Sequence, residues 1–303
     1  MKVAVLGAGS LGSLLGAALS RQHEVTLIGR DPHIAAIREG GLLVTGKTEL
    51  AVRLAATTSP RDVPTPDLIV VTVKAYQTER AIREAEALVG QRTRVLTLQN
   101  GLGNVEALEA VVPREQILAG ATSHGVTYLE PGHVHHAGVG YLRVGSPTGD
   151  VKAAEQVAHA FTECGLPAEP VADVMAEIWA KVIVNVGINP ITAITGLRNG
   201  GLLEVRELKE LMQHACEEAV QVAAAAGVRL PGDDPLYRTL QVASLTAGNK
   251  SSMLQDIERG RRTEIDALSG AIVRLGLKHG VDTPVNASLV ALVKGIEATT
   301  RRA

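Results

Sequence analysis

A glycine-rich hexapeptide near the amino terminus constrains the fold of this chain more than any other feature. The segment Gly7-Ala8-Gly9-Ser10-Leu11-Gly12 follows an apolar run at residues 2–6 and precedes a helix-like pattern. Between a buried strand and a helix, this spacing provides a tight turn, a close backbone approach to a ligand and close helix packing. The free N–H groups at the start of such a helix bind phosphate anions. The motif therefore predicts a dinucleotide site, the alternative being a plain glycine-rich turn.

The alternation of apolar runs with helical segments predicts a parallel α/β sheet over the first half of the chain. Further strands are expected at residues 23–29, 68–73 and 94–98, and the segments 121–129 and 133–145 are expected to close the sheet. From about residue 171 the pattern becomes helical. The expected helices cover residues 171–189, 203–226, 235–247, 252–279 and 284–297. We therefore expect two domains, residues 1–168 and residues 169–303.

Three polar residues follow the carboxyl ends of expected strands, where ligands of open α/β sheets bind. Arg30 follows the second strand, where an arginine pairs with the 2′-phosphate of NADP, although Asp31 is adjacent. Lys74 follows the run at 68–73, and Asn100 lies in Gln99-Asn100-Gly101 after the next strand. The alternatives are a surface arginine, a solvated lysine and a simple turn. The pattern favours NADP as the cofactor.

The most unusual segment runs from Trp179 to Pro190. Lys181, Asn185 and Asn189 are spaced i, i+4 and i+8, so a helix places them in one polar stripe among apolar residues. Polar groups on a mostly buried helix need partners, and a substrate with a carbonyl, a carboxylate and hydroxyls would supply them. The alternative is that they tie neighbouring loops together. Pro190 is expected to mark a bend or the end of this helix.

Two further candidates lie in the expected helix at 252–279. Ser252 stands near its start, where a serine either caps the helix or donates to a carboxylate. Glu264 falls on the same helical face as Ile257 and Leu268, and a carboxylate there is expected to be paired or functional. Arg261, three residues earlier, is the candidate for a purely structural ion pair.

Charge and composition favour a small-molecule enzyme. The net charge is −2 and aromatic residues make up 2% of the chain, so nothing supports binding to nucleic acid or to a membrane surface. For His133, His135 and His136 we favour exposed strand and turn histidines over a metal site, and His124 is a weak site candidate. The amino-terminal apolar run is too short for a signal peptide, so we expect a cytoplasmic protein.

The chain resembles the ketopantoate reductase (2-dehydropantoate 2-reductase) family over essentially its full length. The matching motifs are Gly7–Gly12, Val73-Lys74-Ala75, Leu98-Gln99-Asn100-Gly101, Lys181–Pro190, Asn199-Gly200, Ser251–Asp256, Thr263-Glu264-Ile265-Asp266 and Thr283-Pro284-Val285-Asn286. The resemblance implies a Rossmann-type, doubly wound amino-terminal sheet joined to an all-helical carboxy-terminal domain. It implies NADPH-dependent reduction of 2-dehydropantoate to pantoate, a step of pantothenate and coenzyme A biosynthesis.

The resemblance also implies a role for each candidate residue. Lys181 would be the proton donor, and Glu264 would hold substrate hydroxyls or assist cofactor placement. Arg30, Lys74 and Asn100 would lie along the cofactor. The substrate contacts would be Asn185, Asn189, Asn199, Asn249 and Ser252. The partner would be a small 2-oxo acid, with a homodimer as one option for the assembly. The alternatives are a reductase of another branched 2-oxo acid and an NADP-binding sensor without turnover.

Overall fold

The computed structural model describes residues 1–232 and 234–300, and these divide into two compact units. Unit 1 comprises residues 1–99 and 104–174, and unit 2 comprises residues 100–103 and the chain from Met175 onward. The turn at residues 100–103 is thus grouped with the helical unit although it follows a strand of the sheet. Among the described residues, the last strand ends at Pro170 and only helices follow from Val174 onward.

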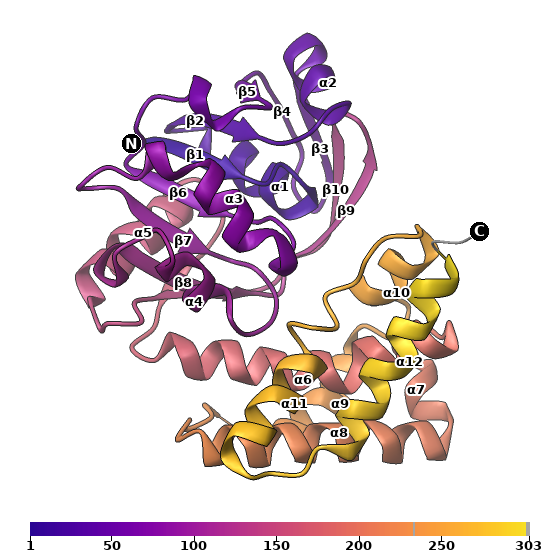
Figure 1. Cartoon of the computed structure of the whole chain (residues 1–303). Coiled ribbons are helices and arrows are strands. Elements are labelled where there is room, and N and C mark those ends of the chain that lie inside the picture. The colour runs from indigo at the N-terminus through magenta and orange to yellow at the C-terminus, as the bar shows by residue number, and fades with distance from the viewer. Residues whose placement is uncertain (233, 301–303) are drawn as a thin grey trace. The chain divides into compact units, whose positions relative to one another are not determined.

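Unit 1 is built on an eight-stranded sheet with a smaller four-stranded sheet beside it (Figure 1). The large sheet has the order β12-β11-β8-β7-β6-β1-β2-β5. Its strands are β1 (Lys2–Leu6), β2 (Glu24–Ile28), β5 (Ala55–Thr57), β6 (Leu68–Val71), β7 (Arg94–Thr97), β8 (Ile117–Thr122), β11 (Leu142–Gly145) and β12 (Glu169–Pro170). The small sheet, β4-β3-β10-β9, contains β3 (Leu42–Gly46), β4 (Leu50–Val52), β9 (Gly125–Glu130) and β10 (His133–Gly138).

The topology of the large sheet is that of a doubly wound dinucleotide-binding domain. Neighbouring strands from β5 through β8 pair in parallel, and β11 alone runs antiparallel to its neighbour β8. Numbered within this sheet, those strands follow the order 3-2-1-4-5-6, with the switch point between β1 and β6. The predicted fold class is confirmed. The expectation that the segments 121–129 and 133–145 close this sheet holds for β11, which pairs with β8. It is wrong for β9 and β10, because β10 pairs with β3 and β9 pairs with β10 in the small sheet.

The helices of unit 1 cover this sheet and bury its apolar side chains. They are α1 (Ser10–Leu19), α2 (His33–Gly40), α3 (Thr78–Glu84), α4 (Asn104–Glu109) and α5 (Val151–Glu163), with short 3₁₀ turns at Pro60–Asp62, Ala75–Gln77, Glu86–Leu88 and Arg114–Gln116. Helix α1 packs on β2 and also contacts β9 and β10, so it lies between the two sheets. Its uninterrupted burial explains the small and aliphatic residues at positions 14–19.

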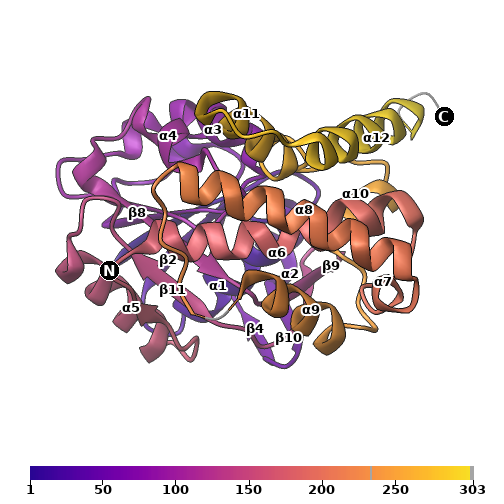
Figure 2. The ribbon, with the colours of Figure 1, turned by 90° about the horizontal axis from the view of Figure 1, so that it is seen from below.

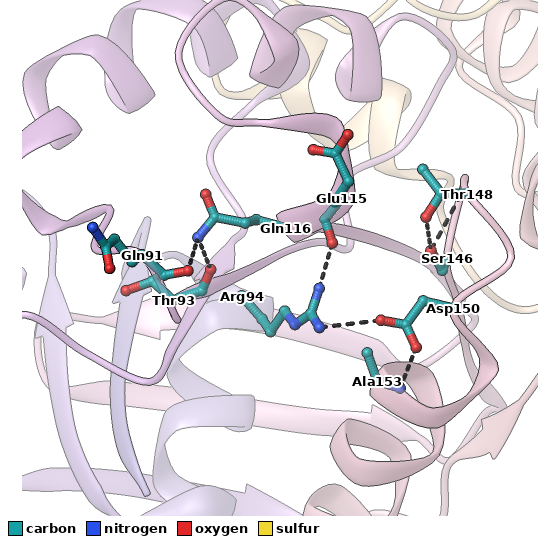
Figure 3. A network of polar contacts seen from close by, with 9 residues as sticks. All are labelled: Gln91, Thr93, Arg94, Glu115, Gln116, Ser146, Thr148, Asp150 and Ala153. Carbon is teal, nitrogen blue, oxygen red and sulfur yellow. Dashed lines mark hydrogen bonds and ion pairs between the residues drawn. The ribbon is translucent and has the colours of Figure 1, made fainter.

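A polar network holds the amino ends of β7 and β8 together (Figure 3). The Arg94 guanidinium contacts the carbonyl of Glu115 and lies 3.1 Å from the carboxylate of Asp150. Asp150 in turn accepts a hydrogen bond from the N–H of Ala153, which caps α5. Gln116 donates to the carbonyl of Thr93 over 3.0 Å. This network lies at the sheet edge opposite the glycine-rich turn, so we interpret it as structural.

Unit 2 consists of α6 (Val174–Thr195), α7 (Gly201–Glu204), α8 (Arg206–Ala225), α9 (Pro235–Leu245), α10 (Ser252–Glu258), α11 (Ser269–His279) and α12 (Pro284–Thr300). Helices α6 and α8 lie side by side in both views (Figures 1 and 2). Gly187 permits this approach, because a Cβ there would lie 2.6 Å from the sulfur of Cys216. Helix α6 has the length and hydropathy of a membrane span, but 78% of that window is buried within the protein.

Two helix boundaries differ from the predictions. Helix α6 does not end at Asn189 but continues through Pro190 to Thr195. Proline removes one hydrogen bond from a helix interior, and the almost continuous burial of residues 182–193 offsets that loss. The predicted helix at 252–279 is two helices, α10 and α11, because α10 ends before Gly260, which has a φ of +63°. Glu264 therefore lies in the connecting segment and not on a helical face.

Candidate active site

The glycine-rich turn of unit 1 forms a cradle made of backbone. The N–H groups of Gly7 and Ala8 both donate to the carbonyl of Ile28 over 2.9 Å, which anchors the turn to the end of β2. Gly7 has a φ of +113°, and a Cβ there would lie 2.6 Å from the nitrogen of Val73. A Cβ on Gly12 would lie 2.2 Å from the carbonyl oxygen of Gly7. Only glycine satisfies both positions.

Gly9 differs from these two glycines. Nothing in the described chain lies within 4 Å of the Cβ it lacks, so its own packing does not require glycine. Gly9 is also the N-cap of α1, and its helix start carries no side-chain cap. The open space and the uncapped N–H groups therefore fit the pyrophosphate of a dinucleotide.

The two basic candidates of unit 1 stand on the same edge of the sheet as this cradle. Arg30 is exposed and lies two residues beyond the end of β2, the position from which a side chain can contact a ribose 2′-phosphate. Lys74 is half-buried in the segment after β6. Buried Gln99 holds that segment in place, because its side-chain amide donates to the carbonyl of Val73 and to the hydroxyl of Thr78, each over 2.7 Å. Sequence reasoning noted Gln99 only as part of a turn.

The central cluster of unit 2 joins Lys181, Asn100 and Glu264. The ammonium of Lys181 donates to Oδ1 of Asn100 over 2.8 Å, and Nδ2 of Asn100 donates to Oε2 of Glu264 over 3.2 Å. The amide of Asn100 thus presents its carbonyl to a cation and its NH₂ group to an anion. Sequence reasoning assigned Asn100 to the cofactor and did not anticipate that it links the other two.

Backbone contacts fix this cluster. Gly101 has a φ of +87°, and a Cβ there would lie 2.5 Å from the carbonyl oxygen of Ala267. The N–H of Leu102 donates to that same carbonyl over 2.9 Å, so the turn carrying Asn100 lies against the segment carrying Glu264. Thr263 anchors the segment through its N–H and its hydroxyl, which donate to Glu297 over 2.7 and 2.6 Å.

Burial changes the proton affinity of Lys181. Desolvation of the ammonium lowers its pKa from 10.5 to about 8, and the nearby Glu264 carboxylate opposes part of that shift. The side chain is half-buried at the surface of α6, so it is both desolvated and accessible. A lysine with this pKa is mostly protonated at neutral pH and is a far stronger acid than an ordinary lysine.

The polar stripe on α6 has the predicted spacing. Asn185 is half-buried and Asn189 is 7% exposed. Within the described residues, neither side-chain amide forms a hydrogen bond to another part of the protein. The alternative that these residues tie neighbouring loops together therefore holds for neither asparagine, and both amides are available to a ligand.

The remaining substrate candidates are Asn199, in the turn after α6, and Asn249 and Ser252, which lie before and at the start of α10. Asn199 is buried and donates through Nδ2 to the hydroxyl of Thr246 over 2.8 Å, while its Oδ1 is buried without a partner in the described chain. Asn249 and Ser252 have exposed side chains. The N-cap of α10 is Ser251, whose hydroxyl accepts from the N–H of Leu254 over 3.1 Å. The capping interpretation of Ser252 is thus wrong, because the serine one position earlier takes that role.

The histidines of the small sheet contact one another and nearby threonines. Nδ1 of His124 lies 3.1 Å from Nε2 of His136, and the hydroxyl of Thr45 lies within 3.2 Å of both His133 and His135. Burial, together with His136, lowers the pKa of His124 to about 4, so His124 is neutral at physiological pH. The expectation of exposed histidines is wrong for His136, which is 1% exposed. Over the described residues, no three His, Cys, Asp or Glu side chains form a group that could hold a metal ion.

The doubly wound fold, the glycine-rich cradle and the Lys181–Asn100–Glu264 cluster define an oxidoreductase that uses a nicotinamide dinucleotide. Residues 3–149 match the family model "Ketopantoate reductase PanE/ApbA", and residues 173–297 match its carboxy-terminal counterpart. The 2-dehydropantoate 2-reductase of Archaeoglobus fulgidus is 40% identical over 300 residues, which cover 98% of each chain. That of Halobacterium salinarum is 41% identical over 97% of this chain and 98% of its own. This chain therefore belongs to the ketopantoate reductase family.

Solved structures agree on the fold and cover two related activities. A PanE/ApbA family ketopantoate reductase from Ralstonia eutropha has a TM-score of 0.93 at 35% identity, covering 99% of this chain and all of its own. D-mandelate dehydrogenase, in its complex with NADH and anilino(oxo)acetate, also has a TM-score of 0.93, at 30% identity and 99% coverage of each chain. The fold thus serves enzymes whose names point to different 2-oxo acids.

Proposed function

We propose that this chain uses NADPH to reduce 2-dehydropantoate to pantoate, a step of pantothenate and coenzyme A biosynthesis. The observation that carries the proposal is the Lys181–Asn100–Glu264 cluster, in which a cation of lowered pKa is hydrogen-bonded to Asn100 and Asn100 in turn to the nearby Glu264 carboxylate. The family relationship supplies the substrate, since the relatives cited above are named as 2-dehydropantoate 2-reductases.

Lys181 would act on the oxygen of the keto group. NADPH, when bound, supplies the hydride that reduces the keto carbon. As negative charge develops on the oxygen, the Lys181 ammonium stabilises it and then donates its proton. Asn100 keeps the ammonium in position by accepting a hydrogen bond from it. Glu264 raises the pKa of Lys181 and so opposes the effect of desolvation, which favours the uncharged amine. The amine left after the transfer regains a proton from solvent.

The other candidates divide between the two predicted domains. Residues 1–168 would bind the cofactor, with the cradle at Gly7–Gly12 on the pyrophosphate and with Arg30 and Lys74 on its polar groups. Residues 169–303 would bind the substrate. Its contacts would be Asn185, Asn189, Asn199, Asn249 and Ser252, with Glu264 accepting from substrate hydroxyls. Asn100 would serve this second group, because its contacts are with Lys181 and Glu264.

A second candidate is a reductase of another 2-oxo acid. The likeness to D-mandelate dehydrogenase supports it, because that structure contains anilino(oxo)acetate, an amide that resembles an aromatic 2-oxo acid. The chemistry of proton donation is the same for both candidates, so the cluster does not distinguish them. The difference lies in the side chain of the acid that unit 2 accepts.

The test measures the rate at which the reduced cofactor is oxidised, from the loss of its absorbance, at several concentrations of the substrate. Ketopantoate, 2-oxoisovalerate and benzoylformate are compared, each with NADPH and with NADH. We expect the highest kcat/KM for ketopantoate with NADPH. A higher kcat/KM for benzoylformate would favour the second candidate, and NADPH binding without turnover of any acid would identify a sensor.

Compartment and assembly are part of the same proposal. A net charge of −2 and the burial of the apolar helix α6 support a cytoplasmic enzyme with no membrane or nucleic-acid partner. We include a homodimer as the assembly to be tested. Analytical ultracentrifugation at micromolar concentration would distinguish it from a monomer.

A further inference from the structure

Two buried hydroxyls join the end of α6 to the start of α10. Thr192 and Ser251 are 0% and 5% exposed, and their hydroxyl oxygens lie 2.7 Å apart. Ser251 is the residue that caps α10. The Thr192 hydroxyl also lies 3.0 Å from the carbonyl oxygen of Asn189, on the same face of α6. One hydroxyl thus touches both the helix turn that carries Asn189 and the cap that precedes Ser252.

A second tether holds the other side of the same segment. The N–H of Asn199 donates to the carbonyl of Asn249 over 3.0 Å, and the N–H of Gly200 donates to that of Ala247 over 3.1 Å. Gly200 permits this approach, since a Cβ there would lie 2.6 Å from the Cβ of Ala247. Residues 246–252 are therefore held at one end by the turn after α6 and at the other by the Thr192–Ser251 contact.

We propose that Thr192 is a positioning residue that sets the placement of Ser252 relative to Asn189, and so determines how tightly the 2-oxo acid binds. The inference rests on the proposed function, which assigns those two residues to the substrate. Loss of one hydroxyl removes the hydrogen bond that joins α6 to the start of α10, which contributes about 0.5–1.5 kcal/mol. The remaining hydroxyl then has contacts only within its own segment, with Leu254 for Ser251 and with the Ile188 and Asn189 carbonyls for Thr192, so the start of α10 is no longer fixed to α6 at this point. A displacement of about 1 Å is enough to weaken a preorganised site markedly.

Thr192 is expected to affect the binding of the oxo acid but not the proton transfer or the binding of the cofactor. Lys181 stands on the same helix as Thr192, but Asn100 holds its ammonium, and no contact of Thr192 reaches that pair. The cradle that would bind the cofactor lies in the other unit. Removing the Thr192 hydroxyl is therefore expected to raise KM for the oxo acid and to leave kcat and the KM for NADPH nearly unchanged.

The test compares Thr192→Val with Thr192→Ser in the full-length, NADPH-dependent enzyme. Valine has the shape of threonine without the hydroxyl, and we expect it to raise KM for the oxo acid about tenfold, the order of one lost buried hydrogen bond. Serine retains the hydroxyl and is expected to restore KM. Thr239→Val is the matched control, because the Thr239 hydroxyl is also fully buried and bonds to the Pro235 carbonyl of its own helix α9, and its other contact is with Cys216 of α8. Its KM should be that of the wild type.

A second variant tests the same contact in case Thr192→Val does not fold. Ser251→Gly removes the other hydroxyl, and glycine is a nearly adequate N-cap, so α10 should persist. The same rise in KM is expected. If either variant lowers the melting temperature but keeps the wild-type KM, the contact is structural only and the positioning role is overturned. If the wild type reduces no 2-oxo acid at all, the proposed function fails, and the positioning role falls with it.

Discussion

The two candidate binding regions are made of different groups, and they are therefore vulnerable to different changes. In unit 1 the cradle consists of backbone N–H groups and of positions where a side chain has no room, as at Gly7 and Gly12. In unit 2 the cluster consists of side chains, with a cation whose pKa is lowered by burial. The first region would be damaged by added atoms and the second by a lost charge. Substitutions of each kind can test this contrast.

The largest effect is expected from Lys181→Ala. The variant removes the proton donor and should lower kcat by about 10²–10⁴-fold, the usual contribution of general acid catalysis. NADPH affinity, measured by fluorescence titration, should remain within about threefold of the wild type, because the cradle lies in unit 1. Turnover close to the wild-type rate would refute the role of Lys181.

Alanine at Gly12 and alanine at Gly9 should have different effects, although both glycines belong to the cradle. Gly12→Ala places a Cβ 2.2 Å from the carbonyl oxygen of Gly7 and should destabilise the fold by about 1–3 kcal/mol, measured by chemical denaturation. Gly9→Ala meets no protein atom within 4 Å, so stability should be unchanged while NADPH affinity falls. Equal stability losses for the two variants would mean that Gly9 serves the fold alone.

Arg30→Ala should have a more selective effect, confined to the binding of one of the two cofactors. Arg30 is exposed at the end of β2, and a charge-assisted hydrogen bond to a 2′-phosphate contributes about 1.5–3 kcal/mol. We expect KM for NADPH to rise about 10- to 100-fold, with little change in KM for NADH. If both cofactors were affected equally, Arg30 would not be reading the phosphate.

The sequence predicts most of unit 1, because buried parallel strands appear as continuous apolar runs. It does not reveal the second sheet, since β3 buries only alternate residues and β4 has three residues of which none is fully buried, so neither forms a continuous buried run. The helix expected at 252–279 shows the opposite error. Apolar residues continue at helical spacing across Gly260, but the glycine ends α10 there, and Glu264 lies outside any helix.

For the candidate site, the sequence indicates the residues but not their partners. Lys181 and Asn100 are 81 positions apart, and Asn100 and Glu264 are 164 apart. No local pattern links groups at such separations, so the sequence places Asn100 with the cofactor and offers Arg261 as the structural alternative for a partner of Glu264. The contact between Thr192 and Ser251 is not predicted for the same reason, since a threonine in an apolar helix gives no signal of what its hydroxyl contacts.

The central claim is that a partly buried lysine ammonium with a lowered pKa protonates the substrate, and the pH dependence of kcat/KM for the oxo acid tests it most directly. Only the protonated form donates, so kcat/KM should be level near neutral pH and fall about tenfold per unit above pH 8, where Lys181 loses its charge. Activity must return at pH 7 after exposure to high pH, which excludes denaturation. A profile that stays level up to about the ordinary lysine pKa of 10.5 would contradict the account.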